Sequence, residues 1–205
     1  MTTTIVALGD STTAGTPGFA SPIEAPPDGS GDAESQYAYW LMRAHPDWRV
    51  LNRGVNGERT DQIRVRFTRD VIQARPDLVI IVAGVNDIYQ GRTAESVQAE
   101  LLSMYSAARD AGIPIVAGSI LPYNTATPEQ NGRMHAVNAW IRDDGSRQTG
   151  LIFCDTRAAV AMPGRPDLLA SSPDDIHPSP EGYRLMAVAL EPSVKAALAA
   201  AHPLR

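Results

Sequence analysis

Leu78-Val79-Ile80-Ile81-Val82-Ala83 decides the fold class, because six apolar residues follow one another without a polar interruption. A strand that is covered on both faces is apolar throughout, whereas a half-exposed strand alternates apolar and polar residues. Longer stretches of helical period separate this run from other short runs rich in β-branched residues. The predicted strands are Thr4–Leu8, Arg49–Asn52, Leu78–Ala83, Ile113–Ser119 and Leu151–Cys154. The pattern predicts an α/β fold with a five-stranded parallel sheet and helices on both of its faces.

Two of the intervening stretches carry clear helical signals. Apolar side chains recur on one face of residues 94–111, at Val97, Leu101, Met104, Tyr105 and Ala108. Near the C-terminus, Ser179-Pro180-Glu181 combines an N-cap serine, a proline at the first helical position and an acid in the first turn. We therefore expect a last helix to begin there. In such folds the functional residues gather at the carboxyl ends of the strands.

The bulk composition is that of a globular protein. The 205 residues fit a single domain spanning 1–205, with 43% hydrophobic and 20% charged residues. A net charge of -5 argues against a nucleic-acid partner, and no run approaches the ~20 apolar residues of a membrane span. With one cysteine, Cys154, neither an internal disulfide nor a zinc site of several cysteines is possible.

The N-terminus has no basic leader followed by an apolar run, so no signal peptide is visible. A cytoplasmic location is the default expectation, and secretion stays open if a leader has been removed. The sequence does not indicate an oligomeric state.

Residues 16–36 interrupt the alternation of strands and helices. They are rich in proline, glycine and serine, and they carry four acids and no base. The segment is too long for an ordinary strand-to-helix connection, so it is either a disordered insertion or a flap near the site. A flap with this charge would repel anionic substrates.

Chemistry-bearing residues follow the predicted strands and precede the last helix. They are Gly9-Asp10-Ser11, Asn52-Arg53-Gly54, Gly84-Val85-Asn86-Asp87 and Asp174-Asp175-Ile176-His177. A serine hydroxyl needs an adjacent base to become a nucleophile, and His177 is the natural base because an imidazole titrates near neutral pH. An acid must then hold the imidazole in the correct tautomer. Asp174, three residues before the histidine, suits this role better than Asp175.

Acyl transfer places negative charge on the former carbonyl oxygen, so hydrogen-bond donors must already be in position to bind this oxygen. The candidates for this oxyanion hole are the backbone N–H groups of Ser11 and Gly54 and the side-chain amide of Asn86. Gly54 suits the role because a residue without Cβ lets the backbone approach the substrate. Tyr123 and Asn124, after the fourth predicted strand, are expected to line the pocket.

In these blocks the chain resembles the SGNH hydrolases of the GDSL esterase/lipase group. Gly9-Asp10-Ser11 matches the first block, Gly54 the second, Gly84-Val85-Asn86-Asp87 the third and Asp174-Asp175-Ile176-His177 the last. The resemblance implies a flavodoxin-like three-layer α/β/α sandwich, no metal or organic cofactor, and hydrolysis through an acyl-enzyme. Thr12 stands where the motif usually has leucine, which concerns packing rather than chemistry.

The leading hypothesis is therefore a serine ester hydrolase acting on small neutral esters, with acetylated carbohydrates as a natural class. A thioesterase or lysophospholipase could use the same machinery on longer acyl substrates, and a non-enzymatic binding module could keep the same fold. Asp174, Asp175 and His177 could instead bind a metal through oxygen and imidazole. Nucleotide binding lacks support, because neither a G-x-G-x-x-G nor a Walker loop follows the first strand.

Overall fold

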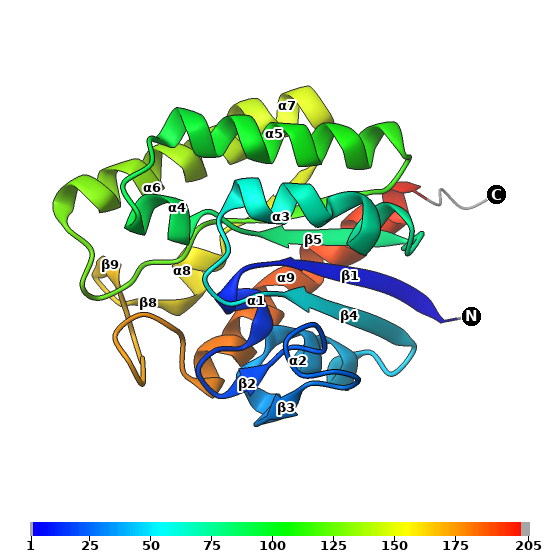
Figure 1. Cartoon of the computed structure of the whole chain (residues 1–205), viewed down its shortest axis with the longest axis horizontal. Helices are drawn as coiled ribbons and strands as arrows, with labels where there is room; N and C mark the ends of the chain where they lie inside the picture. The colour runs from blue at the N-terminus through cyan, green and yellow to red at the C-terminus, as the bar shows by residue number, and fades with distance from the viewer. Residues whose placement is uncertain (1, 202–205) are drawn as a thin grey trace.

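The computed structural model describes residues 2–201 and is built around one five-stranded parallel sheet (Figure 1). The strand order is β4-β1-β5-β6-β7, the order typical of flavodoxin-like folds. The bounds are Thr3–Gly9 for β1, Trp48–Gly54 for β4, Leu78–Val82 for β5, Ile115–Gly118 for β6 and Ile152–Cys154 for β7. The α/β class, the five parallel strands and the three-layer arrangement predicted from the sequence are confirmed.

Helices cover both faces of the sheet (Figure 1). One layer contains α3 (Thr60–Phe67), α4 (Val85–Tyr89), α5 (Ala94–Asp110), α6 (Pro128–Trp140) and α7 (Ser146–Thr149), with the π-helical turns η2 (Thr68–Ile72) and η3 (Ile141–Gly145). The other contains α2 (Tyr37–Ala44), α8 (Thr156–Val160) and α9 (Pro180–Ala201). The short α1 (Ser11–Ala14) follows β1 directly, and a small hairpin of β8 (Ala161–Met162) and β9 (Arg165–Leu169) follows α8.

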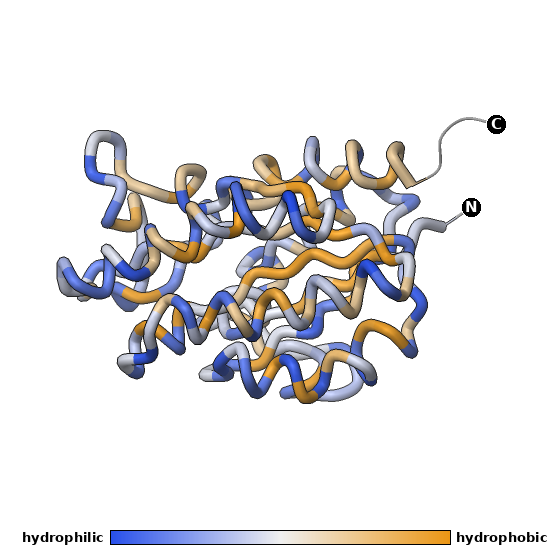
Figure 2. The backbone as a smooth tube through the Cα atoms, turned by 90° about the horizontal axis from the view of Figure 1, so that it is seen from above, coloured by the Kyte–Doolittle hydropathy of each residue, from blue (hydrophilic) through white to orange (hydrophobic). Residues whose placement is uncertain are grey.

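The two helical layers explain why β5 is apolar throughout. Val79 and Ile81 face one core cluster together with α3, α5 and α6, whereas Leu78, Ile80 and Val82 face the other with α2 and α9. Each of these five side chains is at most 2% exposed. In Figure 2 hydrophobic residues run through the interior of the molecule, whereas hydrophobic and hydrophilic residues alternate along the helices.

The helical signals in the sequence are also confirmed. The predicted apolar stripe of α5 is buried. Helix α9 begins at Pro180, and the Ser179 hydroxyl accepts the N–H of Gly182 at 3.3 Å. Although α9 is 22 residues long, none of the helices within residues 2–201 is both long and apolar enough to cross a membrane.

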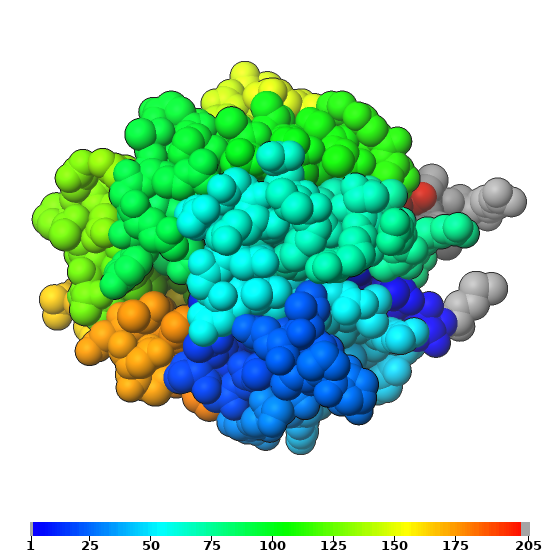
Figure 3. Space-filling model, in the orientation of Figure 1, coloured from blue at the N-terminus to red at the C-terminus, as the bar shows by residue number. Residues whose placement is uncertain are grey.

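Residues 16–36 form a compact, ordered segment rather than a disordered insertion. Within them β2 (Phe19–Ala20) pairs with β3 (Ser30–Gly31), and the 3-10 turn η1 (Ala33–Ser35) follows. The Ser21 hydroxyl donates to the Gly54 carbonyl at 2.6 Å, which ties the segment to the end of β4. Figure 3 shows this blue segment against the cyan surface of the β4–α3 connection.

Candidate active site

The sheet register brings three strand ends level with one another. Gly9, the last residue of β1, pairs with Gly54 of β4 on one side and Val82 of β5 on the other. The loops after these strands must therefore start from the same edge of the sheet, at the left of Figure 1. This edge carries the serine, the second-strand loop and the asparagine turn.

Ser11 lies at the first position of α1, directly after the residue that caps this helix. The Asp10 carboxylate caps the helix by accepting the N–H of Thr12 at 3.0 Å. Ser11 is 4% exposed, and its own N–H belongs to the amides that a helix leaves without an internal partner. A buried hydroxyl and a free N–H thus stand side by side.

His177 reaches Ser11 across 166 residues of sequence. Its Nε2 lies 2.9 Å from the Ser11 Oγ, and its Nδ1 lies 2.7 Å from Oδ2 of Asp174. The other oxygen of Asp174 accepts the backbone N–H groups of Ile176 and His177, at 3.0 and 2.8 Å. The structure therefore joins Ser11, His177 and Asp174 in one hydrogen-bonded chain.

The turn between Asp174 and His177 depends on an unusual backbone conformation. Asp175 has a φ of 63°, in the left-handed region, which aspartate tolerates better than most residues. Its carboxylate points away from the imidazole and accepts the side-chain amide of Asn124 at 3.0 Å. The division of roles expected from the sequence, with Asp174 rather than Asp175 facing the histidine, matches this geometry.

The hydrogen bonds of this turn keep Asp174 ionised. Burial alone would raise the pKa of its carboxyl, but the bonds from the His177 ring and from the two backbone N–H groups outweigh burial and lower that pKa. A carboxylate in this state can hold the ring tautomer whose Nε2 accepts a proton. Among residues 2–201, no group of three or more His, Cys, Asp and Glu side chains is arranged to hold a metal ion.

Asn86 and Asp87 connect the third block to the second. The Asn86 side-chain amide donates one hydrogen to the Glu58 carbonyl at 2.9 Å, and its second hydrogen is free for a substrate oxygen. The Asp87 carboxylate is fully buried and accepts both the N–H and the hydroxyl of Thr60, each at 2.8 Å. The start of α3 and the asparagine are therefore fixed to each other.

Gly54 does not fit the oxyanion role that the sequence suggested for it. Its N–H donates to the side-chain oxygen of Asn52 at 2.9 Å. A Cβ at Gly54 would lie 2.0 Å from the backbone nitrogen of Ala14. The missing side chain therefore lets β4 approach α1, not the substrate.

Gly57 is the residue that the sequence reasoning missed. In the part of the chain that the structure describes, its N–H is the one amide of residues 54–58 without a hydrogen-bond partner. Gly54 donates to Asn52, and Val55 donates to the Gly9 carbonyl. Asn56 donates to Glu24 and Glu58 to Val55. Gly57 has a φ of 77°, and a Cβ added to it would meet nothing within 4 Å. The carbonyl of the next residue, Glu58, accepts the Asn86 amide. The N–H of Gly57 is therefore a free donor close to Asn86.

Arg66 holds the loops after β1 and β4 together through hydrogen bonds. It is 7% exposed, and its guanidinium donates to the Gly9 carbonyl and to the Arg53 carbonyl, each at 2.8 Å. Its Nε donates to the Glu58 carboxylate at 2.6 Å. One planar group thus ties the strand that leads to Ser11 to the turn that contains Gly57. No motif in the sequence signalled this role.

The space beside Ser11 is small. Its enclosed volume is about 20 Å³, little more than the ~10–15 Å³ that one water molecule requires. Its lining residues are Ser11, Thr12, Val85, Asn86, Tyr89, Leu121, Pro122, Tyr123, Ile176 and His177. Tyr123 lines it as expected, whereas Asn124 instead holds Asp175 and the N–H of Leu169.

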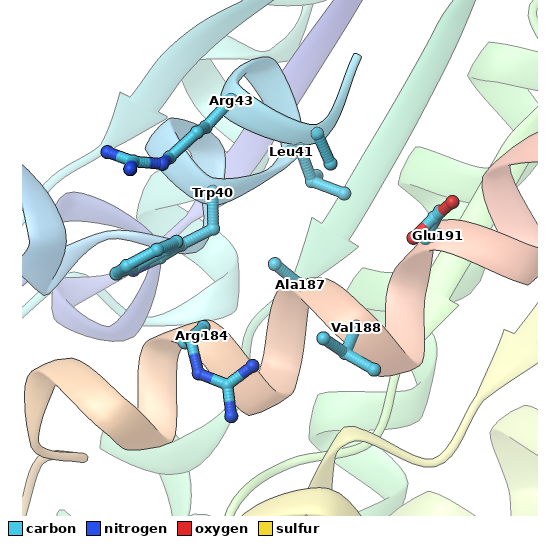
Figure 4. Close-up of a pocket in the computed structure, with 8 residues that line it drawn as sticks. Trp40, Leu41, Arg43, Arg184, Ala187, Val188 and Glu191 are labelled. Atoms are coloured by element: carbon cyan, nitrogen blue, oxygen red, sulfur yellow. The ribbon is translucent and has the colours of Figure 1, made fainter.

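Two other features lie apart from this pocket. Of the described residues, none in 16–36 lines it, so the segment does not form a flap over this pocket. A groove of about 250 Å³ runs between α2 and α9, lined among others by Trp40, Arg43 and Arg184 (Figure 4). It contains none of the residues of the Ser11 chain.

The contact of Gly54 with α1 predicts that Gly54→Ala destabilises the fold. The added methyl would overlap backbone atoms that cannot move independently, so we expect a loss of about 3 kcal/mol or more in the free energy of unfolding. Urea denaturation measures it. Gly132→Ala is the matched control, because its Cβ in α6 meets nothing within 4 Å, and it should gain about 0.5–1 kcal/mol. A Gly54→Ala protein as stable as the wild type contradicts the close approach.

The burial of the Asp10 carboxyl predicts that the free energy of unfolding depends on pH. Burial raises the pKa of its carboxyl to about 7; the charge of Asp87 adds to the rise, and hydrogen bonds from Thr12 and Gly84 oppose it. An acid whose pKa rises on folding favours the protonated fold, so the free energy of unfolding falls as pH increases from about 4 to about 7.

Asp10→Asn removes this titration. The stability difference between Asp10→Asn and the wild type should therefore shift in favour of the variant from pH 5 to pH 8, by on the order of 2 kcal/mol. Urea denaturation at both values measures it. Asp28→Asn, in the exposed part of the 16–36 segment, serves as control and should show no such shift. An unchanged difference for Asp10→Asn would argue that its carboxyl titrates alike in both states.

Comparison with known proteins places the fold in a family. The model of the GDSL-like lipase/acylhydrolase family matches residues 7–185. An acetylxylan esterase from Geobacillus stearothermophilus is 29% identical over 167 residues, 74% of this chain and 75% of that protein.

Two solved structures share the fold over nearly the whole chain. A catalytic mutant of an acetylxylan esterase from Geobacillus stearothermophilus superposes with a TM-score of 0.73 at 21% identity, over 95% of each chain. A member of the lipolytic G-D-S-L family from Veillonella parvula gives 0.76 at 17% identity, over 94% of this chain and 98% of the other. The resemblance found in the sequence is thus confirmed: the chain belongs to the GDSL-like lipase/acylhydrolase family and is a carboxylic-ester hydrolase.

Proposed function

We propose that this protein hydrolyses acetyl esters of carbohydrates through an acyl-enzyme formed on Ser11. The observation that carries the proposal is the hydrogen-bonded chain from the Ser11 Oγ through His177 to Asp174, with distances of 2.9 and 2.7 Å. Both donor–acceptor distances are within the hydrogen-bonding range that proton transfer requires. This chain of hydrogen bonds ends beside a small pocket of about 20 Å³.

In the first half-reaction the Ser11 oxygen attacks the ester carbonyl carbon while its proton passes to Nε2 of His177. The imidazolium then gives this proton to the alcohol oxygen as the carbon–oxygen bond breaks, and the alcohol leaves. In the second half-reaction water attacks the acetyl-enzyme and gives its proton to His177. Acetate is released, and the Ser11 oxygen takes back the proton.

The negative charge on the tetrahedral intermediate needs donors that face the former carbonyl oxygen. We assign these to the N–H groups of Ser11 and Gly57 and to the free amide hydrogen of Asn86. Each lacks another acceptor among residues 2–201, so no existing bond has to break when the charge develops. Donors fixed in this way stabilise a transition state by about 3–4 kcal/mol each.

Two arguments support an acetyl carbohydrate as the substrate. The space of about 20 Å³ beside Ser11 accepts the methyl group of an acetyl, whereas a longer acyl chain finds no enclosed volume there. The similar protein from Geobacillus stearothermophilus is an acetylxylan esterase. A thioesterase or lysophospholipase would need room for a longer acyl chain.

Replacement of Ser11 tests the mechanism. Ser11→Ala should lose about four or more orders of magnitude in kcat on p-nitrophenyl acetate, because no other group can form the acyl-enzyme. It should also lose labelling by a fluorophosphonate. Ser103→Ala, an exposed serine on α5, is the control and should keep full activity. Unlabelled, inactive wild-type protein would instead favour a binding module on the same fold.

The size of the pocket predicts the acyl preference. Along a series of p-nitrophenyl esters from acetate to octanoate, kcat/KM of the wild type should fall by about tenfold or more, because each added methylene must leave the enclosed space. A rise with chain length would reject the acetyl preference and favour the thioesterase or lysophospholipase alternative.

A further inference from the structure

Exposed apolar side chains gather at the mouth of the Ser11 pocket. Four large hydrophobic side chains are well exposed among the described residues: Val65, Tyr89, Ile176 and Val188. Two of them, Tyr89 at 58% and Ile176 at 40%, line the pocket that contains Ser11. Single exposed apolar residues need no explanation, but apolar surface beside a reactive serine marks a ligand contact.

The Tyr89 ring is held in place from below. Its edge-on contact with Tyr123 has a centroid separation of 5.9 Å and an interplanar angle of 65°. Tyr123 is 1% exposed and belongs to the core cluster beneath the pocket. Helix α4, which ends at Tyr89, also carries Asn86. The position of the ring is therefore fixed relative to the oxyanion donors.

Polar groups border both apolar residues. On one side Gln90 follows Tyr89, and its amide oxygen accepts the Arg59 guanidinium at 2.9 Å. On the other side the exposed Asp175 precedes Ile176, and its carboxylate accepts one bond from Asn124. The mouth thus offers apolar faces next to groups that can bind hydroxyls.

The reaction divides the substrate between these two environments. The acyl group enters the enclosed space beside Ser11, so the alcohol must extend outward across the mouth. A pyranose ring has a C–H face that packs on an aromatic ring and hydroxyls at its rim that bind amides and carboxylates. A small aliphatic alcohol offers neither such a face nor such hydroxyls.

We propose that Tyr89 is the stacking platform for the sugar ring that carries the acetyl group, with Ile176 as a second apolar contact. Tyr89 thereby determines specificity for the alcohol portion. The inference rests on the proposed function, which supplies the carbohydrate. It assigns no part in proton transfer to Tyr89.

The test compares two substrates that share the acetyl group, an acetylated xylo-oligosaccharide and ethyl acetate. Tyr89→Ala should raise KM for the oligosaccharide, and its ratio of kcat/KM between oligosaccharide and ethyl acetate should fall by about tenfold, which corresponds to one aromatic contact. Tyr89→Phe keeps the ring and should retain the ratio within about threefold. Val65→Ala removes an apolar side chain from α3 that is even more exposed than Tyr89, at 79% against 58%, but does not line the pocket, and it should behave as the wild type.

The outcomes separate the two proposals. A Tyr89→Ala protein with an unchanged ratio, including one that loses activity equally on both substrates, overturns the platform while the esterase stands. A wild type that hydrolyses ethyl acetate but not the oligosaccharide overturns the carbohydrate substrate, and the platform with it. A Tyr89→Phe protein as impaired as Tyr89→Ala would assign the effect to the hydroxyl and also reject stacking.

Discussion

The registration of three parallel strands is the constraint on which the site depends. Because Gly9 lies level with both Gly54 and Val82, the loops after β1, β4 and β5 leave the sheet at one height. Hydrogen bonding fixes this register, and a slip by one residue would turn every side chain to the opposite face. The close packing of the β5 side chains against both helical layers opposes such a slip, because each side chain would then meet different neighbours. Core packing and site geometry are thus two consequences of the same pairing.

Buried charges then fix the loops that the register brings together. Arg66 binds the carbonyl of Gly9 and the carboxylate of Glu58, while Asp87 binds the start of α3. Desolvating these ions is costly, and a buried charge is tolerated where several hydrogen bonds satisfy it. Removal of one partner would leave the other ion unpaired. The site therefore gains rigid loops, and the stability of the fold becomes sensitive to any change in this network.

The sequence predicts the sheet and much of the site, because strand periodicity and catalytic residue types are local signals. Ser11, Asn86, Asp174 and His177 all meet at the expected edge. The sequence fails where a role depends on which amide is left without a partner. Gly54 ends β4 and Gly57 lies three residues later, and the bond from the Gly54 N–H to Asn52 distinguishes them. The order of residues 16–36 cannot be predicted from their low apolar content, which does not reveal that Ser21 binds the end of β4 and Glu24 the loop after it.

The site treats the two halves of an ester differently. On the acyl side the proposed selection works by lack of space, because the pocket beside Ser11 is small and an added methylene would have to extend out of it. On the alcohol side the proposed selection comes from favourable contacts such as the face of Tyr89. Exclusion discriminates among acyl groups whatever the alcohol is, whereas contacts raise the rate for a preferred alcohol without forbidding others. Under the proposed function, the group transferred to Ser11 is therefore selected by its size and the released alcohol by its contacts.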